Sequence, residues 1–195
     1  MVVSYLAAIV FSILFTLNIS AQNGNTRYGN NALLNTQISQ NCSAFGENAL
    51  SNSKAAFNTA VGSNALTNNT SGHNNTAIGS YSLSRNTIGY LNTANGDLSL
   101  SYNTTGYWNT AVGTNALQFN TIGMYNTASG VNALQNNVSG YANTATGVQA
   151  LMSNTLGYWN TANGVNSLYS NTTGHENAAM GVNALFSNTE GFYNT

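Results

Sequence analysis

The sequence predicts an all-β fold, a single-stranded β-solenoid in which one short unit of chain winds into coil after coil. The first observation is that a 17-residue unit recurs from residue 25 almost to the end of the chain. The second is that this unit is too short for a pair of packed helices and is rich in Gly and Asn, which are poor helix formers. The third is the absence of Pro, which suits uninterrupted hydrogen bonding between coils. We therefore expect a parallel β-roll or β-helix.

The chain begins with an apolar segment, residues 2–17, which is short for a membrane span. It is followed by small and polar residues, with Ile19 and Ala21 at the positions that a signal peptidase reads. This pattern predicts a signal peptide over residues 1–21, cut before Gln22, and a solenoid domain over residues 22–195. An uncleaved anchor is the alternative. Both place the repeats outside the cytoplasm, and after cleavage we expect no membrane insertion.

The repeat unit is represented by residues 75–91, numbered here from its opening Asn as positions 1 to 17. Recurring residues are Asn at 1, Thr at 2, Ala at 3, Gly at 5, Ala or Ser at 8, Leu at 9, Asn at 12, Thr at 13 and Gly at 15. Ten units begin at Asn25, Cys42, Asn58, Asn75, Asn92, Asn109, Asn126, Asn143, Asn160 and Asn177. The second is one residue short, which we expect a corner to absorb. Because Asn194 and Thr195 start an eleventh unit, we expect the domain to be truncated at its C-terminal end.

Each unit is expected to form two short strands joined by corners. In the representative unit the strands would be Thr76–Ile78 and Ser82–Ser84. Gly79 and Gly89 would give the backbone freedom that the corners need.

Stacking in register places like residues above one another, about 4.8 Å apart, in columns that run along the solenoid. The Leu at position 9 is the one large apolar residue present in all ten units, so its column should point inward. The Ala at position 3 should face it across a thin interior. The Asn columns at positions 1 and 12 can form amide ladders, with each side chain donating to the next coil.

Aromatic residues gather at positions 16 and 17, and they form the candidate binding surface. Three interpretations are open: stacking that shields a corner, an interface between subunits, or a platform for a sugar or another ligand. The residues of this surface are Tyr90, Tyr107, Trp108, Tyr141, Tyr158 and Trp159.

Charged residues make up only 4% of the chain, which excludes a basic surface for nucleic acid. The single cysteine, Cys42, excludes an internal disulfide and a multi-cysteine metal site. His73 and His175 lie six coils apart, roughly 29 Å, so they cannot share one metal ion. The four carboxylates are scattered singly, with no catalytic pair among them. We expect no enzyme activity, no catalytic or metal-binding residues and no cofactor.

The Thr column at position 2 suggests a different function, the ordering of water or ice on a flat face. Position 4 would share that face, because side chains two residues apart in a strand point the same way. Position 4 is irregular, however, with Val61, Asn95 and Met180 among its residues. This irregularity disfavours a match to an ice lattice.

The pattern Asn-Thr-Ala-Ile-Gly-x-x-Ser-Leu at residues 75–83, with Val and Ala variants at 58–66 and 109–117, resembles the head repeats of YadA-type trimeric autotransporter adhesins. It is also similar to the repeats of tail-fibre-like bacterial surface proteins. The resemblance covers residues 25–195 and implies a left-handed parallel β-roll that assembles as a homotrimer. The period departs from the family, being 17 residues where adhesin heads have roughly fourteen.

What the resemblance implies is an extracellular or cell-surface adhesin or fibre segment, a nearly neutral rod about 50 Å long. Its partner would be an extracellular matrix protein or a glycan, bound multivalently. A structural spacer is the main alternative, and a water- or ice-ordering protein is the less favoured one.

Overall fold

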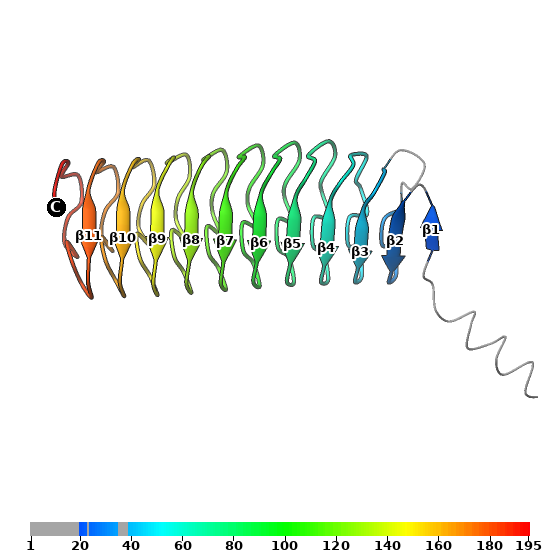
Figure 1. Cartoon of the computed structure of the whole chain (residues 1–195), viewed down its shortest axis with the longest axis horizontal. Coiled ribbons are helices and arrows are strands. Elements are labelled where there is room, and N and C mark those ends of the chain that lie inside the picture. The colour runs from blue at the N-terminus through cyan, green and yellow to red at the C-terminus, as the bar shows by residue number, and fades with distance from the viewer. Residues whose placement is uncertain (1–19, 23, 35–38) are drawn as a thin grey trace, which may run out of the picture.

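The computed structural model describes residues 20–22, 24–34 and 39–195, and it shows a β-solenoid (Figure 1). Within these residues there are eleven strands in one sheet, in chain order, and no helix. The strands are β1 (Ser20–Gln22), β2 (Asn25–Tyr28), β3 (Ser43–Phe45), β4 (Thr59–Val61), β5 (Thr76–Ile78), β6 (Thr93–Asn95), β7 (Thr110–Val112), β8 (Thr127–Ser129), β9 (Thr144–Thr146), β10 (Thr161–Asn163) and β11 (Ala178–Met180). Strands β2 to β11 are parallel, so the predicted solenoid of stacked coils is confirmed.

The register follows the sequence repeat. Thr93 in β6 pairs with Thr110 in β7, 17 residues later, and the same offset holds along most of the sheet. Across the short second unit the offset falls to 16, with Ser43 paired to Thr59, and the strands remain aligned. The missing residue is therefore absorbed between β3 and β4.

Strand β1 is the exception to the parallel order, because it pairs antiparallel with β2 at the N-terminal end of the sheet. It spans the bond between Ala21 and Gln22 where we predict signal cleavage. The remainder of the predicted signal peptide, residues 1–19, lies outside the described residues. In the part of the chain that the structure describes, no helix is both long and apolar enough to cross a membrane.

The interior is thin and consists of small side chains around one column of leucines. The Leu column is buried from Leu33 to Leu168, and Leu185 in the last coil is partly buried. The Ala residues at position 3 of the repeat, which are the middle residues of the strands, are buried against it, as in Ala94 and Ala111. Both predictions are confirmed, and they explain why Ala occupies position 3 in every strand from β3 to β11, with Arg27 taking its place only in β2.

The prediction of a second strand at Ser82–Ser84 is wrong. Leu83 has a φ of 49°, in the left-handed region, where an extended strand cannot continue. Backbone N–H groups here bond three residues back, as from Asn86 to the Leu83 carbonyl at 3.0 Å, so this side of the coil is a series of turns. Burial of the Leu side chain compensates for the left-handed backbone that a bulky residue disfavours.

The glycines at positions 5 and 15 are each required, but for different physical reasons. Gly79, at position 5, has a φ of 127°, which L-residues rarely adopt, so the prediction of a flexible corner is confirmed there. Gly89, at position 15, has no such φ, but a Cβ on it would collide with the Asn86 side chain and the Gly106 carbonyl. Close approach of neighbouring coils, rather than backbone freedom, demands this second glycine.

The Asn column at position 1 forms a buried amide ladder. The Oδ1 atom of Asn92 accepts from both the backbone N–H (3.0 Å) and the Nδ2 (3.1 Å) of Asn109 in the next coil. Each Nδ2 therefore donates to the preceding coil, the reverse of the direction we predicted. The backbone N–H and the side-chain Nδ2 of one Asn donate to the same oxygen, so both point to the preceding coil, and together they fix the direction of the ladder.

The second ladder, at position 12, is joined to the first. Asn120 Nδ2 donates to Asn103 Oδ1 at 2.8 Å and also to the Gly123 carbonyl at 3.1 Å. The same carbonyl accepts from Asn109 Nδ2 at 2.8 Å. A single Gly carbonyl in each coil thus links both ladders, and these buried amides are accounted for by the stacking of coils.

In the second coil other residues take the Asn positions of both ladders. The Cys42 thiol accepts from the Asn58 backbone N–H at 3.5 Å, and Ser53 Oγ accepts from Asn69 Nδ2 at 3.3 Å. Burial raises the pKa of the Cys42 thiol, so it remains protonated and unreactive at neutral pH. Cys42 is a structural residue.

Position 17 also has a left-handed backbone, and this gives a stability prediction. Ala142 has a φ of 52°, which costs an L-residue about 1 kcal/mol or more. We expect Ala142→Gly to raise the free energy of unfolding by about 1 kcal/mol, measured by thermal or urea unfolding. The control is Ala111→Gly in β7, where Ala111 is buried in a strand. That change should lower stability by a similar amount, and equal signs for the two variants would contradict the explanation.

Candidate functional site

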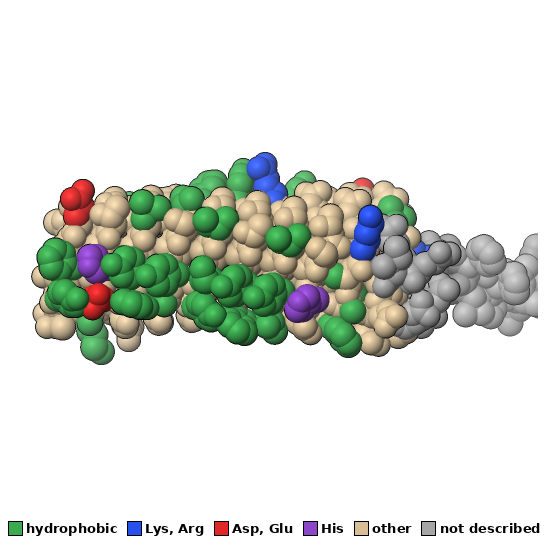
Figure 2. All heavy atoms as spheres, turned by 90° about the horizontal axis from the view of Figure 1, so that it is seen from above, with side chains coloured by type: hydrophobic (Ala, Val, Ile, Leu, Met, Phe, Trp, Pro, Cys, Tyr) green, Lys and Arg blue, Asp and Glu red, His purple; other side chains and the backbone are tan. Residues whose placement is uncertain are grey.

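The aromatic residues of positions 16 and 17 form a continuous surface feature, here called the aromatic strip. Figure 2 shows it as a band of hydrophobic side chains running along the rod between the two histidines. Both histidines belong to the position 16 column. The strip comprises His73, Tyr90, Tyr107, Trp108, Tyr125, Tyr141, Tyr158, Trp159, His175, Phe192 and Tyr193.

The position 16 rings stack face to face along the axis. Tyr90 and Tyr107 have centroids 4.9 Å apart and ring planes 2° apart. Tyr141 and Tyr158 stack at 5.0 Å and 1°. These distances equal the spacing between coils, so the stack follows directly from the register of the strands.

Met124 divides this column into two stacks. The first contains His73, Tyr90 and Tyr107, and the second contains Tyr141, Tyr158, His175 and Phe192. A ring inside a stack has both faces covered by its neighbours. Tyr90 and Tyr158 lie inside the stacks and keep only their edges and hydroxyls for a ligand, whereas Tyr107 and Tyr141 end their stacks on either side of Met124.

The two tryptophans, at position 17, are oriented differently. The ring planes of Trp108 and Tyr107 differ by 67°, and those of Trp159 and Tyr158 by 79°. Trp108 is 47% exposed and Trp159 is 55% exposed. Because the Tyr planes lie across the axis, the Trp planes run nearly along it, and about half of each Trp surface is open to a partner.

Two clusters result from the six predicted residues. Tyr90, Tyr107 and Trp108 lie together, and so do Tyr141, Tyr158 and Trp159. Tyr125 extends the first cluster, with its ring 5.0 Å from that of Trp108, although it was not in the predicted surface. Its position in the repeat was the available signal, since it follows Trp108 by 17 residues.

The electrostatics of the strip favour neutral hydrogen-bonding groups. The charge of Glu176 raises the pKa of Tyr193, and partial desolvation, with Tyr107 and Tyr90 adding to it, raises that of Tyr125. Both phenols therefore stay protonated at neutral pH, as donors and acceptors. In the described part of the chain, no three His, Cys, Asp or Glu side chains come together as a metal site would require. The arrangement can stack and hydrogen-bond with a partner.

The interrupted stack gives a second stability prediction. We expect Met124→Tyr to join the two stacks and raise the free energy of unfolding by about 0.5–1.5 kcal/mol, because it adds stacked aromatic pairs. Tyr158→Ala, which removes a ring between Tyr141 and His175, should lower it by a similar or larger amount. Thermal unfolding measures both, and an unchanged Tyr158→Ala variant would refute a stabilising role for the stack.

No protein-family model matches this chain, and neither the curated proteins nor the solved structures contain a match.

Proposed function

We propose that the chain is a rod segment of an extracellular or cell-surface adhesin or fibre, which attaches to a glycan or a matrix protein through its aromatic strip. The observation that carries this proposal is the pair of exposed tryptophans set against tyrosine stacks on one side of a rigid rod. Exposed Trp and Tyr are the residues that most often anchor a binding partner.

The rod supports multivalent attachment. Trp108 and Trp159 are 51 residues apart, three coils, which corresponds to roughly 14 Å. The amide ladders hold this spacing fixed, so two weak contacts to one polymeric partner can act together. The resemblance to adhesin heads agrees with this role.

A glycan and matrix-protein array tests the proposal. We expect the wild-type chain to bind at least one class of polymer and the double variant Trp108→Asn, Trp159→Asn to lose most of that binding. Asn is compatible with the backbone at position 17, since Asn74 has the same left-handed conformation, with a φ of 55°. Val131→Thr is the matched control: it changes an exposed apolar side chain at position 6 to a polar one, and Thr114 stands at that position one coil earlier.

The rival function is that of a structural spacer. A spacer would bind nothing on the array, and its double Trp variant would behave as the wild type does. Loss of binding in the Val131→Thr control as well would show a general effect of apolar surface, and the strip would then have no specific role.

We further propose that copies of the chain associate as a homotrimer, as the adhesin resemblance implies. The outer face of the sheet exposes apolar side chains that association would cover, including Val61, Ile78 and Val112. Sedimentation equilibrium should then give a mass three times that of the chain. A monomer over the whole concentration range would refute this assembly.

The ordering of water or ice has one observation in its favour. Seven consecutive strands, β4 to β10, carry Thr at position 2 in register on the outer face of the sheet. An ice-recrystallisation assay decides this alternative, and no inhibition at high protein concentration excludes it.

A further inference from the structure

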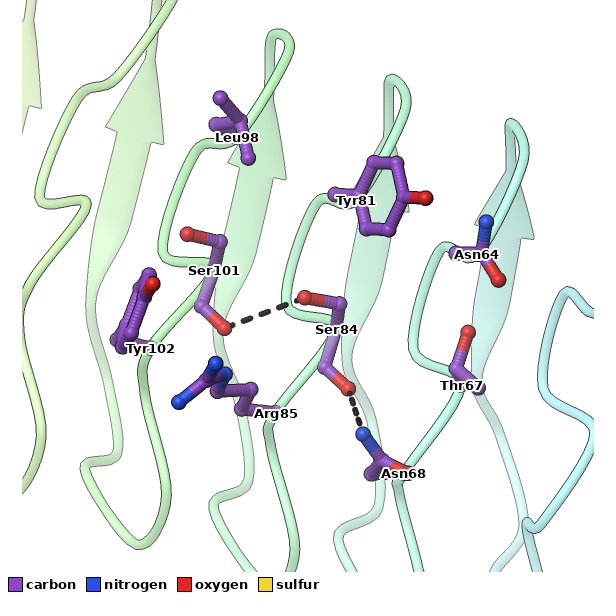
Figure 3. A pocket seen from close by; sticks show the side chains of 9 residues that line it. All are labelled: Asn64, Thr67, Asn68, Tyr81, Ser84, Arg85, Leu98, Ser101 and Tyr102. Atoms are coloured by element: carbon purple, nitrogen blue, oxygen red, sulfur yellow. Dashed lines mark hydrogen bonds between the residues drawn. The ribbon is translucent and has the colours of Figure 1, made fainter.

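A groove of about 370 Å³ lies across three coils near the middle of the N-terminal half of the rod (Figure 3). Its residues come from positions 7, 10 and 11, and so from other columns than the aromatic strip. The lining residues are Asn64, Thr67, Asn68, Tyr81, Ser84, Arg85, Leu98, Ser101 and Tyr102. The volume is within the range of small-molecule sites.

The floor of the groove consists of small residues at position 10: Thr67, Ser84 and Ser101. Two hydrogen bonds hold it, from Asn68 Nδ2 to the Ser84 carbonyl at 2.9 Å and from Ser84 Oγ to the Ser101 carbonyl at 3.3 Å. In later coils the same column carries larger side chains, Gln118, Gln135, Met152, Tyr169 and Phe186. The groove therefore exists only where the sequence keeps this column small.

One wall of the groove departs from the pattern that stabilises its column. Position 7 carries Asn in most coils, and these amides pair between coils, as Asn115 Nδ2 does with Asn132 Oδ1 at 3.1 Å. Tyr81 and Leu98 replace Asn in two of the three coils of the groove, and Asn115 Oδ1 in the next coil is buried with no hydrogen-bond partner. The apolar wall therefore replaces side-chain hydrogen bonds of the Asn column that would stabilise the stack of coils.

The opposite wall carries Arg85, the single cation of the chain after Lys54. Its guanidinium carbon lies over the Tyr102 ring, 4.1 Å from the ring centre, which is the geometry of a cation–π contact (Figure 3). Within the described residues the guanidinium has no ion pair and no hydrogen bond to a side chain or carbonyl. A guanidinium that lies over a ring still has N–H groups for a planar, bidentate acceptor such as a carboxylate.

We propose that this groove binds a pyranose sugar that carries a carboxylate, such as a uronic acid. The carboxylate would pair with Arg85, the apolar face of the sugar ring would pack on Tyr81, which is 48% exposed, and the sugar hydroxyls would meet the Asn64 and Asn68 amides at the rim. This occupant accounts for the isolated cation, the apolar wall and the polar rim together. It does not depend on attachment through the aromatic strip.

Titration with D-glucuronate, followed by saturation-transfer NMR on the full chain, tests the proposal. D-glucose supplies the ring without the charge, and acetate supplies the carboxylate without the ring. We expect glucuronate to bind at least tenfold more tightly than either. Equal binding of acetate would reduce the groove to a simple anion site and overturn the proposal, as would no binding of glucuronate.

The variants can be taken from the repeat itself, so each is compatible with the fold. Ser84→Gln fills the floor as Gln118 does in the same column two coils later, and Arg85→Asn places the residue found at Asn68 and Asn136. Each should weaken glucuronate binding about tenfold or more while the melting temperature stays near that of the wild type.

Lys54→Gln is the charge control, since it removes one positive charge outside the groove. We expect it to bind glucuronate as the wild type does. If Ser84→Gln binds as well as the wild type, or if Lys54→Gln is as weak as Arg85→Asn, the ligand is not in this groove. Array binding that depends on the two tryptophans would be untouched by that result.

Discussion

Replacing Asn109 with aspartate is expected to destabilise the rod by about 4 kcal/mol or more, although the two side chains have the same shape. Asn109 is fully buried, and its Nδ2 donates to Asn92 Oδ1 at 3.1 Å and to the Gly123 carbonyl at 2.8 Å. In Asn109→Asp an oxygen that cannot donate would face two acceptors, and an unpaired charge would be buried. Thermal unfolding followed by far-ultraviolet circular dichroism measures the loss.

The control is Asn136→Asp, the same chemical change at position 11, where the side chain is only half-buried. Its melting temperature should differ little from that of the wild type. Lowering the pH should also recover part of the stability of Asn109→Asp, because the protonated carboxyl can donate one hydrogen bond again. Equal melting temperatures for the two variants would show that the ladder contributes nothing.

Replacing Gly113 with alanine is expected to have an effect of similar size. Gly113 has a φ of 126°, and a Cβ there would lie 2.7 Å from the Gly130 carbonyl oxygen and 2.8 Å from its carbon in the next coil. Backbone strain accounts for about 1–3 kcal/mol, and separation of the two coils adds the rest, for a total of about 4 kcal/mol or more. Urea unfolding monitored by circular dichroism gives this value.

Gly181 provides the matched control for Gly113→Ala. Its φ is 117°, but a Cβ on it would have no atom within 4 Å. Gly181→Ala should therefore show the backbone strain alone, and the difference between the variants isolates the contact between coils. If both variants lose the same stability, the close stacking of glycines is not what this column requires.

Much of the fold follows from the sequence because stacking imposes one requirement on every coil. A residue type that recurs every 17 residues has to suit a column of its own kind, and this identified the Leu core, the Ala column and the two Asn columns. The 17-residue period does not predict the backbone conformation at each position of the repeat. Leu83 was expected in a strand, yet it has a left-handed φ of 49°, because its burial outweighs the intrinsic preference of the residue.

The candidate site was predicted less completely, since it consists of the variable positions. The sequence placed the aromatic residues in two adjacent columns, but ring orientation depends on how neighbouring side chains pack. The 2° angle between Tyr90 and Tyr107 and the 67° angle between Tyr107 and Trp108 separate the stacked tyrosines from the exposed tryptophans. The groove at Arg85 was not predicted, because it depends on the relative side-chain sizes in three columns. Small residues at position 10 form its floor, and larger residues at positions 7 and 11 form its walls.

The central claim is that the 17-residue unit is the unit of stacking, so that function is left to the exposed, variable residues. Circular dichroism and thermal unfolding of two deletion variants test it most directly. Deletion of residues 109–125 removes one whole coil and joins Trp108 to Asn126 in register, and it should leave strand content and cooperative unfolding close to those of the wild type. Deletion of residues 109–116 shifts every later column by about half a coil and should abolish cooperative unfolding. Equal loss of structure in both variants would contradict the account.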